Sequence, residues 1–263
     1  YQPARDVLVL LLRKKGFAKR LVLSAASGTA RVHFTEQKYE NPDNPPMFCM
    51  LARKIFSASK LVSVEQKGLE RVIEFTFDTA NEMGDRISPK IVCELITGAG
   101  NIILVADDGK IYDAVHRSDI EKSDRLILSG ATYRYPDSQN KLDISKLDIL
   151  PVAEKILAHK SEKLSSAVLK TVEGVSPLVC REIALTAYGD DVSVADITDS
   201  KPLITALCSL KNHLTDSEFV LLYKPDGTPA DFSYIPITQY GGLYTKRSFA
   251  SASSLAFSSC AFT

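Results

Sequence analysis

The side chains of this chain whose types and spacing could do chemistry are mostly cationic, and the chemistry that they fit is the binding of phosphate. Lys14 and Lys15 lie in the segment RKKGFAKR, between apolar runs at residues 7–12 and 21–25 that are typical of strands. Gly16 can take the positive φ of a turn, so the segment predicts a hairpin with a basic tip. Such a tip could contact phosphates, or it could be a solvated turn that protects a strand edge.

A second pair of cations closes a predicted helix. Pro46 ends a proline-stiffened approach and can occupy the first helical position. The face that recurs at helical spacing, and that we expect to be buried, holds Met47, Met50 and Leu51. Arg53 and Lys54 follow at the end of the helix, where positive charge complements the helix dipole or contacts RNA.

Two further positions could contact an anion. Arg31 opens an alternating polar and apolar run at residues 31–34, which predicts a strand, and His33 could face RNA or lie on the strand surface without a role. Ser176, in the segment GVSP, is placed as the N-cap of a helix whose first residue is Pro177. Because the N–H groups of a helix N-terminus bind anions, Ser176 is a candidate phosphate contact.

The histidines and cysteines form no pattern of metal ligands or catalytic groups. They are dispersed along the chain at His33, His116, His159 and His213, and at Cys49, Cys93, Cys180, Cys208 and Cys260. An odd number of cysteines without a C-x-x-C pair argues against a disulfide framework and a structural zinc site. TGAGN, at residues 97–101, leads into a strand-like run and not a helix, so it predicts a turn and not a phosphate loop. We expect no metal, no cofactor and no catalytic residue.

Composition describes an ordinary globular chain with an uneven distribution of charge. Of its 263 residues, 45% are apolar and 24% are charged. Residues 1–60 hold 11 Lys or Arg and 4 Asp or Glu, whereas the remainder holds 21 and 28, which points modestly to nucleic acid early in the chain. No membrane span or signal peptide is visible, which predicts a cytoplasmic protein that binds no membrane. The opening YQPARDVLVLLL is typical of the approach to a strand, so we expect residues upstream of it.

The order of the patterns predicts an α+β fold with mostly antiparallel strands. Strand signals dominate residues 1–140, with one or two helices. The polar linker YPDSQNK leads to residues 141–216, where apolar residues recur at helical spacing and predict a small helical domain. Residues 217–263 return to strand character around the turn sequence PDG and predict a β hairpin with a tail.

Several segments, taken together, resemble a known family. NPPMFCMLARK, GLERVIEF, NEMGD, CELI and NIILVADDGKIYDA resemble, in that order, the N-terminal domain of the NFACT family, and the similarity runs over about residues 1–244. GVSPLVCREIA resembles the helix-hairpin-helix-like domain of the same family. The resemblance implies an N-terminal domain similar to that of formamidopyrimidine DNA glycosylases, then the helical domain, and then a β hairpin leading toward a coiled coil that this sequence lacks.

The bacterial members of this family are ribosome quality control factors, also labelled fibronectin-binding proteins. The resemblance implies a non-enzymatic factor that binds a large ribosomal subunit obstructed by peptidyl-tRNA, recruits alanine tRNA and promotes C-terminal alanine tailing of the stalled chain. The RNA contacts that it implies are Glu70, Arg71, Glu94, Leu95 and Ile96. Arginine can fork onto phosphate or stack on a base, and a carboxylate can accept from a base amino group.

Two positions depart from the family pattern. Glu70 replaces the aspartate of an Asp-Arg pair and keeps the acidic charge at greater length. The family's Gly-Arg-His-Ser-Asn turn is replaced by Thr97, Gly98, Ala99, Gly100 and Asn101. Cationic and polar contacts are lost in this replacement, so we expect RNA contact at the turn to be altered.

Two other functions are the alternatives to RNA binding. A DNA glycosylase-like repair enzyme would use an N-terminal proline amine and usually a four-cysteine zinc finger, and the given sequence has neither. A surface adhesin that binds fibronectin would need display outside the cell, for which no anchor, signal or disulfide pattern is visible.

Overall fold

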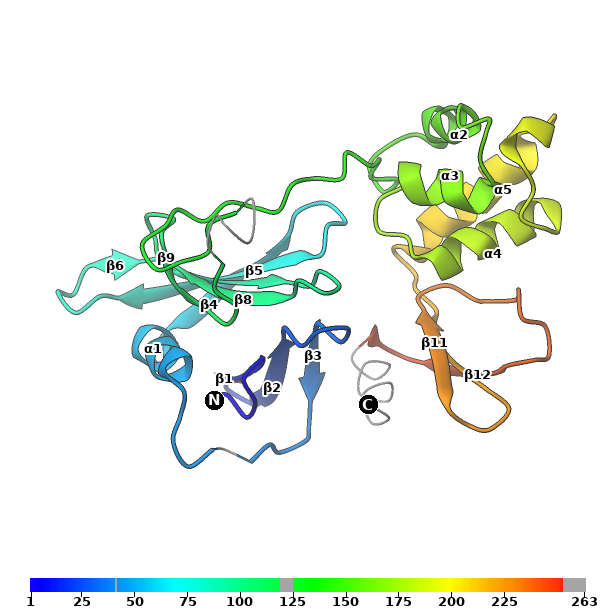
Figure 1. Cartoon of the computed structure of the whole chain (residues 1–263). Helices are drawn as coiled ribbons and strands as arrows, with labels where there is room; N and C mark the ends of the chain where they lie inside the picture. Colours follow the sequence, from blue (N-terminus) through cyan, green and yellow to red (C-terminus); the bar gives the residue numbers. More distant parts are fainter. Residues whose placement is uncertain (41, 119–124, 253–263) are drawn as a thin grey trace. The chain divides into compact units, whose positions relative to one another are not determined.

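The computed structural model describes residues 1–40, 42–118 and 125–252, and the chain divides into two compact units at residues 1–137 and 138–263 (Figure 1). The division falls inside the polar linker YPDSQNK. Antiparallel sheets together with helices confirm the predicted α+β class. Cys260 and most of the terminal tail lie outside the described residues.

The N-terminal unit begins with a three-stranded antiparallel sheet made of β1 (Val7–Lys14), β2 (Phe17–Ser24) and β3 (Arg31–Thr35). Lys14 pairs with Phe17, so the turn between the first two strands contains only Lys15 and Gly16. Gly16 has φ +75°, a backbone conformation that residues with a side chain rarely adopt. The predicted hairpin is confirmed, with strands that reach further into the basic segment than expected.

A six-stranded antiparallel sheet forms the rest of this unit's β structure. Its strands are β4 (Lys60–Gln66), β5 (Val72–Ala80), β6 (Arg86–Ile87), β7 (Lys90–Glu94), β8 (Asn101–Val105) and β9 (Ile111–Ala114). They are ordered β4-β5-β7-β8-β9, and β6 pairs with β5 at its edge. Gly98 in the turn after β7 has φ +77°, as expected for a turn glycine in TGAGN.

The two faces of the six-stranded sheet are covered by different parts of the chain. The smaller sheet and the helix α1 (Met47–Phe56) share a hydrophobic core with one face, on the side where Figure 1 draws them. That core includes Leu8, Leu23, Phe48, Phe75 and Ile91. On the other face, Val72, Val92 and Ile103 pack with Ile127 and Tyr133. Because side chains alternate along a strand, this second face also receives Glu74 and Glu94.

The buried face of α1 differs from the expected one. Met47 and Met50 are 75% and 51% exposed, whereas the buried residues are Phe48, Cys49 and Ala52. Leu51 is partly buried against the core, as expected. The helix begins at Met47, with Pro46 in the N-cap position and not at the first helical position. Every residue from 47 to 52 is apolar, so helical spacing alone does not select the buried face, and the sheets against which the helix packs decide it.

His33 was expected to face outward, and this expectation was wrong. It is 4% exposed on β3, and its Nδ1 atom has no hydrogen-bond partner among the described residues. Burial, with the nearby charge of Arg31, lowers its pKa from 6.5 to about 4. The imidazole is therefore neutral at ordinary pH.

This histidine predicts a pH-dependent stability. Its pKa is lower in the folded state, so the unfolded chain takes up the proton first as pH falls, and the contribution to stability is lost between pH 6.5 and about 4. The loss is at most about 3 kcal/mol. Urea unfolding should give a lower free energy of unfolding at about pH 5 than near neutral pH. His33→Leu should reduce this difference between the two pH values, and His213→Leu is the control. An unchanged difference in His33→Leu would contradict this account.

The C-terminal unit combines helices with a small sheet around one core. Its helices are α2 (Ile149–Leu157), α3 (Leu164–Thr171), α4 (Pro177–Tyr188), the short 3₁₀ helix η1 (Val194–Asp196) and α5 (Lys201–His213). Its antiparallel sheet has the order β11-β10-β12, with β10 at Phe219–Tyr223, β11 at Pro229–Ser233 and β12 at Thr245–Phe249. Val220 and Ile237 share the core with Leu207 and Val168.

A buried carboxylate fastens α4 to the loop after β11. Glu182 is buried, and its carboxylate accepts hydrogen bonds from Thr238 N (2.7 Å) and Gln239 N (3.0 Å). The hydroxyl of Thr238 and the side-chain amide of Gln239 donate to it as well. Several donors around one carboxylate compensate for its removal from water.

Candidate nucleic-acid interface

The turn between β4 and β5 meets the turn after β7 at one end of the six-stranded sheet. Arg71 Nη1 donates to Thr97 Oγ1 at 3.1 Å, and Leu95 N donates to the carbonyl of Arg71 at 2.7 Å. Val72 and Glu94 are direct partners in the ladder between β5 and β7. The residues of GLER and of CELI, far apart in the sequence, therefore lie beside each other.

Glu70 and Arg71 occupy a well-defined backbone turn. Glu70 N donates to the carbonyl of Lys67 at 3.1 Å, and the carbonyl of Glu70 accepts from Gln66 Nε2 at 2.8 Å. Arg71 is exposed and Glu70 is half-buried. The turn thus presents one fixed, accessible guanidinium beside a carboxylate, an arrangement that suits phosphate or a base edge.

Glu94 lies beneath this surface. It is 2% exposed, and its carboxylate is held by Arg125 in a two-pronged ion pair, with Nη2–Oε1 at 2.6 Å and Nη1–Oε2 at 3.2 Å. Tyr133 Oη also donates to Glu94 Oε1 at 2.9 Å. Burial, followed by the charge of Glu94, raises the pKa of Tyr133. The Glu94 carboxylate is consequently not a surface group. It binds the side chains of Arg125 and Tyr133 and so holds the segment that carries them against the sheet.

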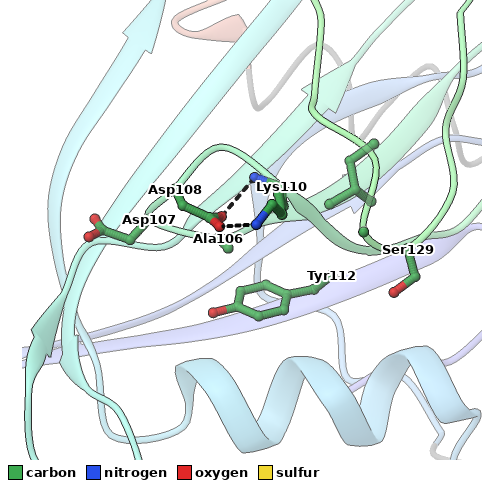
Figure 2. Close-up of a pocket in the computed structure, with 8 residues that line it drawn as sticks. Ala106, Asp107, Asp108, Lys110, Tyr112 and Ser129 are labelled. Atoms are coloured by element: carbon green, nitrogen blue, oxygen red, sulfur yellow. Dashed lines mark hydrogen bonds and ion pairs between the residues drawn. The ribbon is translucent and has the colours of Figure 1, made fainter.

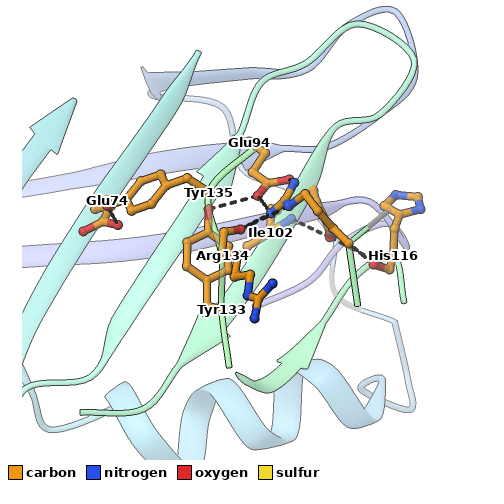
Figure 3. Close-up of polar contacts among 9 residues, drawn as sticks. Glu74, Glu94, Ile102, His116, Tyr133, Arg134 and Tyr135 are labelled. Atoms are coloured by element: carbon orange, nitrogen blue, oxygen red, sulfur yellow. Dashed lines mark hydrogen bonds and ion pairs between the residues drawn. The ribbon is translucent and has the colours of Figure 1, made fainter. Parts of the chain in front are cut away.

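A second carboxylate on the same face has an analogous environment. Glu74 is buried, pairs with Lys90 Nζ at 2.9 Å and accepts from Tyr135 Oη. Figure 3 shows Tyr135 directed at Glu74 and Tyr133 directed at Glu94. The rings of Tyr133 and Tyr135 lie 5.4 Å apart between centroids, inclined at 64°. Residues 125–135 therefore cover this face, and the two acids are paired with Arg125 of this segment and with Lys90 of β7.

Gly100 allows the smaller sheet to approach the turn after β7. A Cβ atom at this position would lie 2.9 Å from the carbonyl oxygen of Ala25 and 3.1 Å from the Cβ of Ala30. Arg31 follows directly and donates to the carbonyl of Thr29 at 2.8 Å. Arg31 thus lies on the same end of the unit as Arg71, and its contact with RNA stays a prediction.

Asn101 fixes the neighbouring end of β9. Its side chain donates to the carbonyl of His116 at 2.7 Å and accepts from the N–H of the same residue at 3.0 Å. Asn101 is buried, whereas His116 is half-exposed. Figure 3 shows His116 at the margin of the network. The asparagine that closes TGAGN is therefore an organising residue of this end of the sheet.

The other predicted contacts lie elsewhere. Lys54 pairs with Glu82 at 2.7 Å, beyond the opposite end of β5, and this hydrogen bond raises the pKa of Lys54. Arg53 is exposed on the same helix end. Lys14 and Lys15 are exposed at the tip of the β1–β2 hairpin, the end of β2 remote from Ala25. These cations are not part of the surface around Arg71.

Ser176 lies in the C-terminal unit, where it caps α4 as predicted. Its hydroxyl accepts the N–H of Val179 at 3.3 Å, and Pro177 is the first helical residue. The cap is confirmed. A phosphate contact at this position stays a prediction.

A pocket of about 450 Å³ lies at the turn between β8 and β9 (Figure 2). Asp108 pairs with Lys110 at 2.9 Å, and Asp107 Oδ1 accepts the N–H of Ser88 at 2.9 Å. Tyr112 and Ser129 are among the other residues that line it. Both acids already interact with neighbouring residues of the chain, Asp108 with Lys110 and Asp107 with Ser88, so neither is a free polar group for a ligand.

Among the residues that the structure describes, no cluster of His, Cys, Asp and Glu has the arrangement of a metal site. Within the same residues, no helix has both the length and the apolar character that a membrane span requires. The four described cysteines carry free thiols.

The residues that sequence reasoning missed are Arg125, Tyr133, Tyr135, Lys67 and Lys90. Strand alternation offered one usable signal, since it places Glu74 on the same face as the apolar Val72. A carboxylate on a buried face requires a partner, but alternation does not say which residue supplies it.

A family model describing the NFACT N-terminal and middle domains matches residues 1–257. The chain belongs to the NFACT family. This NFACT chain is 35% identical over 219 residues to the Rqc2 homolog RqcH of Bacillus subtilis (strain 168), which covers 81% of the chain and 37% of that relative. It is 25% identical over 249 residues to the archaeal Rqc2 homolog aRqcH of Methanocaldococcus jannaschii, covering 92% of the chain and 35% of that relative. It therefore spans about a third of the length of these relatives.

Solved structures give the same fold. The fibrinogen binding protein from Staphylococcus aureus matches with a TM-score of 0.79 at 22% identity, covering 97% of the NFACT chain and 88% of that structure. The family resemblance read from the ordered motifs is thus confirmed.

Proposed function

We propose that this chain is the RNA-binding part of a cytoplasmic ribosome quality control factor. In this role it binds tRNA, by resemblance alanine tRNA, together with a large ribosomal subunit obstructed by peptidyl-tRNA, and it promotes C-terminal alanine tailing of the stalled chain. It does so as a binding module without catalytic residues. The names of its relatives, which denote Rqc2 homologs and, for the human relative, a ribosome quality control complex subunit, support this role.

One observation carries the proposal at the level of residues. The Glu70-Arg71 turn and the Leu95-Ile96 segment adjoin through the bonds of Arg71 to Thr97 and Leu95. An exposed guanidinium on a fixed turn, with apolar side chains beside it, suits an RNA whose bases are accessible. Glu94 contributes from below by holding the segment that covers the sheet.

Changing Glu70 and Arg71 together to alanine is expected to weaken tRNA binding by about five- to a hundredfold, because a fixed arginine contact to a base or phosphate contributes about 1–3 kcal/mol. The measurement is filter binding to alanine tRNA at one fixed, moderate salt concentration, since phosphate contacts are screened by salt. The melting temperature of the variant should stay close to that of the unchanged chain, because both side chains reach the surface.

The control is the double variant Asp78→Ala/Arg86→Ala. Arg86 pairs with Asp78 near the other end of β5 and is also exposed, so this control, like the test variant, removes one acid and one base and leaves the net charge unchanged. Equal tRNA affinities of the Glu70 and Arg71 double variant and the unchanged chain would refute the proposed role of the turn. An equal loss in the control would mean that charged side chains in general, and not this turn, bind the RNA.

The alternative function is that of a surface protein binding fibronectin. The Staphylococcus aureus structure and one from Streptococcus suis are described as fibrinogen-binding and fibronectin/fibrinogen-binding proteins. At 22% and 23% identity these likenesses concern the fold, so the ribosomal role is the one proposed. Fractionation of cells separates the two, because a predominantly surface location would count against the ribosomal role.

A further inference from the structure

Tyr135 is an exposed aromatic ring that is held in one place. It keeps 37% of its surface exposed, while its hydroxyl donates to the buried Glu74. Lys90 neutralises that carboxylate, and the ring of Tyr133 abuts the ring of Tyr135 at 5.4 Å between centroids. A ring fixed at its hydroxyl and at its edge loses little freedom when a planar ligand stacks on it.

A cation accompanies this ring. Lys67 Nζ lies 4.9 Å from the centre of the Tyr135 ring. Lys67 is exposed and flexible, so its ammonium can leave the ring for a phosphate of a ligand that takes its place. Arg134, next in sequence to Tyr135, is exposed as well.

The ring belongs to the surface already described. Lys67 starts the same turn that carries Glu70 and Arg71, as the bond between Glu70 N and the Lys67 carbonyl shows. Arg71 in turn contacts Thr97. A continuous strip therefore runs from Tyr135 through Lys67 to Arg71 and the turn after β7.

We propose that Tyr135 is a stacking platform for an unpaired base of the bound RNA, with Lys67 binding the phosphate beside that base. The assignment rests on the RNA-binding function proposed above, and it adds a binding position for one base to the surface around Arg71. Fixed aromatic rings beside cations are how proteins hold single-stranded segments, because every base has a face to stack and every nucleotide a phosphate. A continuous duplex keeps its base faces covered, so the site selects loops and ends.

Tyr135→Leu tests the stacking directly. It should weaken binding of a short, unstructured RNA by roughly tenfold, whereas Tyr135→Phe, which keeps the ring, should lose less. The dependence of affinity on salt should not change in Tyr135→Leu, because no phosphate contact is removed, whereas Lys67→Met should lower the salt slope by about 1. Phe232→Leu, which removes an exposed ring of the C-terminal unit, is the matched control.

A second readout does not depend on the folding of the leucine variant. A fluorescent purine placed in the RNA should be quenched on binding to the unchanged chain and to Tyr135→Phe, and replacing that purine by an abasic nucleotide should weaken binding to both. Undiminished affinity for the abasic RNA, or equal affinities of Tyr135→Leu and the unchanged chain, overturns the stacking assignment. If the Glu70 and Arg71 double variant still loses affinity in that case, the proposed function stands; if the unchanged chain binds no RNA, both fail.

Discussion

Replacing Glu94 with alanine is expected to destabilise the N-terminal unit by about 3 kcal/mol, one of the largest effects of any single substitution in this chain. The change removes the Glu94 carboxylate from its ion pair with the mostly buried guanidinium of Arg125 and takes away the acceptor of Tyr133 Oη. Urea unfolding gives the free energy, and hydrogen exchange locates the loss. Amides of β7 and β8 should exchange faster while those of α4 stay as protected as before.

Two comparisons make this prediction specific. Glu36→Ala removes an exposed glutamate of the same unit and should change stability by well under about 1 kcal/mol. The double variant Glu94→Ala/Arg125→Ala should be less destabilised than the sum of the single variants, because the ion pair that the two side chains share is lost only once. Additive losses, or a Glu94→Ala variant as stable as Glu36→Ala, would show that the pair is not coupled.

Glu182→Ala should have a similar effect on the C-terminal unit. The substitution deprives Thr238 and Gln239 of the acceptor for backbone and side-chain donors, which we expect to cost about 3 kcal/mol. The loop after β11 should lose protection first, and β12, which follows that loop, should lose it next. Thermal unfolding and hydrogen exchange measure both consequences.

The matched control is Glu154→Ala, which removes an exposed glutamate from α2 in the same unit. That change should be nearly neutral, since alanine is also the better helix former. If Glu182→Ala and Glu154→Ala have the same melting temperature, the hydrogen bonds to the Glu182 carboxylate contribute little net stability, which would contradict this prediction.

Local chemistry allowed much of the fold to be predicted. Gly16 and the TGAGN segment mark turns between strands, and Ser176 followed by Pro177 marks the start of a helix, because each depends on the backbone preferences of a few adjacent residues. The change from alternating to helical spacing likewise located the helices.

The positions that could not be predicted depend on distant partners. Met47 and Met50 lie on a helix that is apolar on several sides, so the choice of Phe48 and Ala52 for burial is made by the sheets against which the helix packs. His33 occupies an alternating strand, and which face of that strand is covered cannot be read from the alternation itself.

The candidate site shows the same limit. Family resemblance pointed to Glu94, but its partner Arg125 is 31 residues away with no pattern linking the two. Arg71 and Thr97 are 26 residues apart and meet only because β5 pairs with β7. Such surfaces form because the register of paired strands brings distant residues together, and the spacing of those residues in the sequence does not predict the register.

The cover formed by residues 125–135 bears on how this unit is made during synthesis. All six strands of the larger sheet are complete by residue 114, but a nascent chain of that length lacks the segment that covers Glu74 and Glu94. The apolar side chains Val72, Val92 and Ile103 of the same face would then be open to water, because Ile127 and Tyr133 have not yet been made. Completion of the N-terminal unit therefore waits until residue 135 has emerged from the ribosome that translates it.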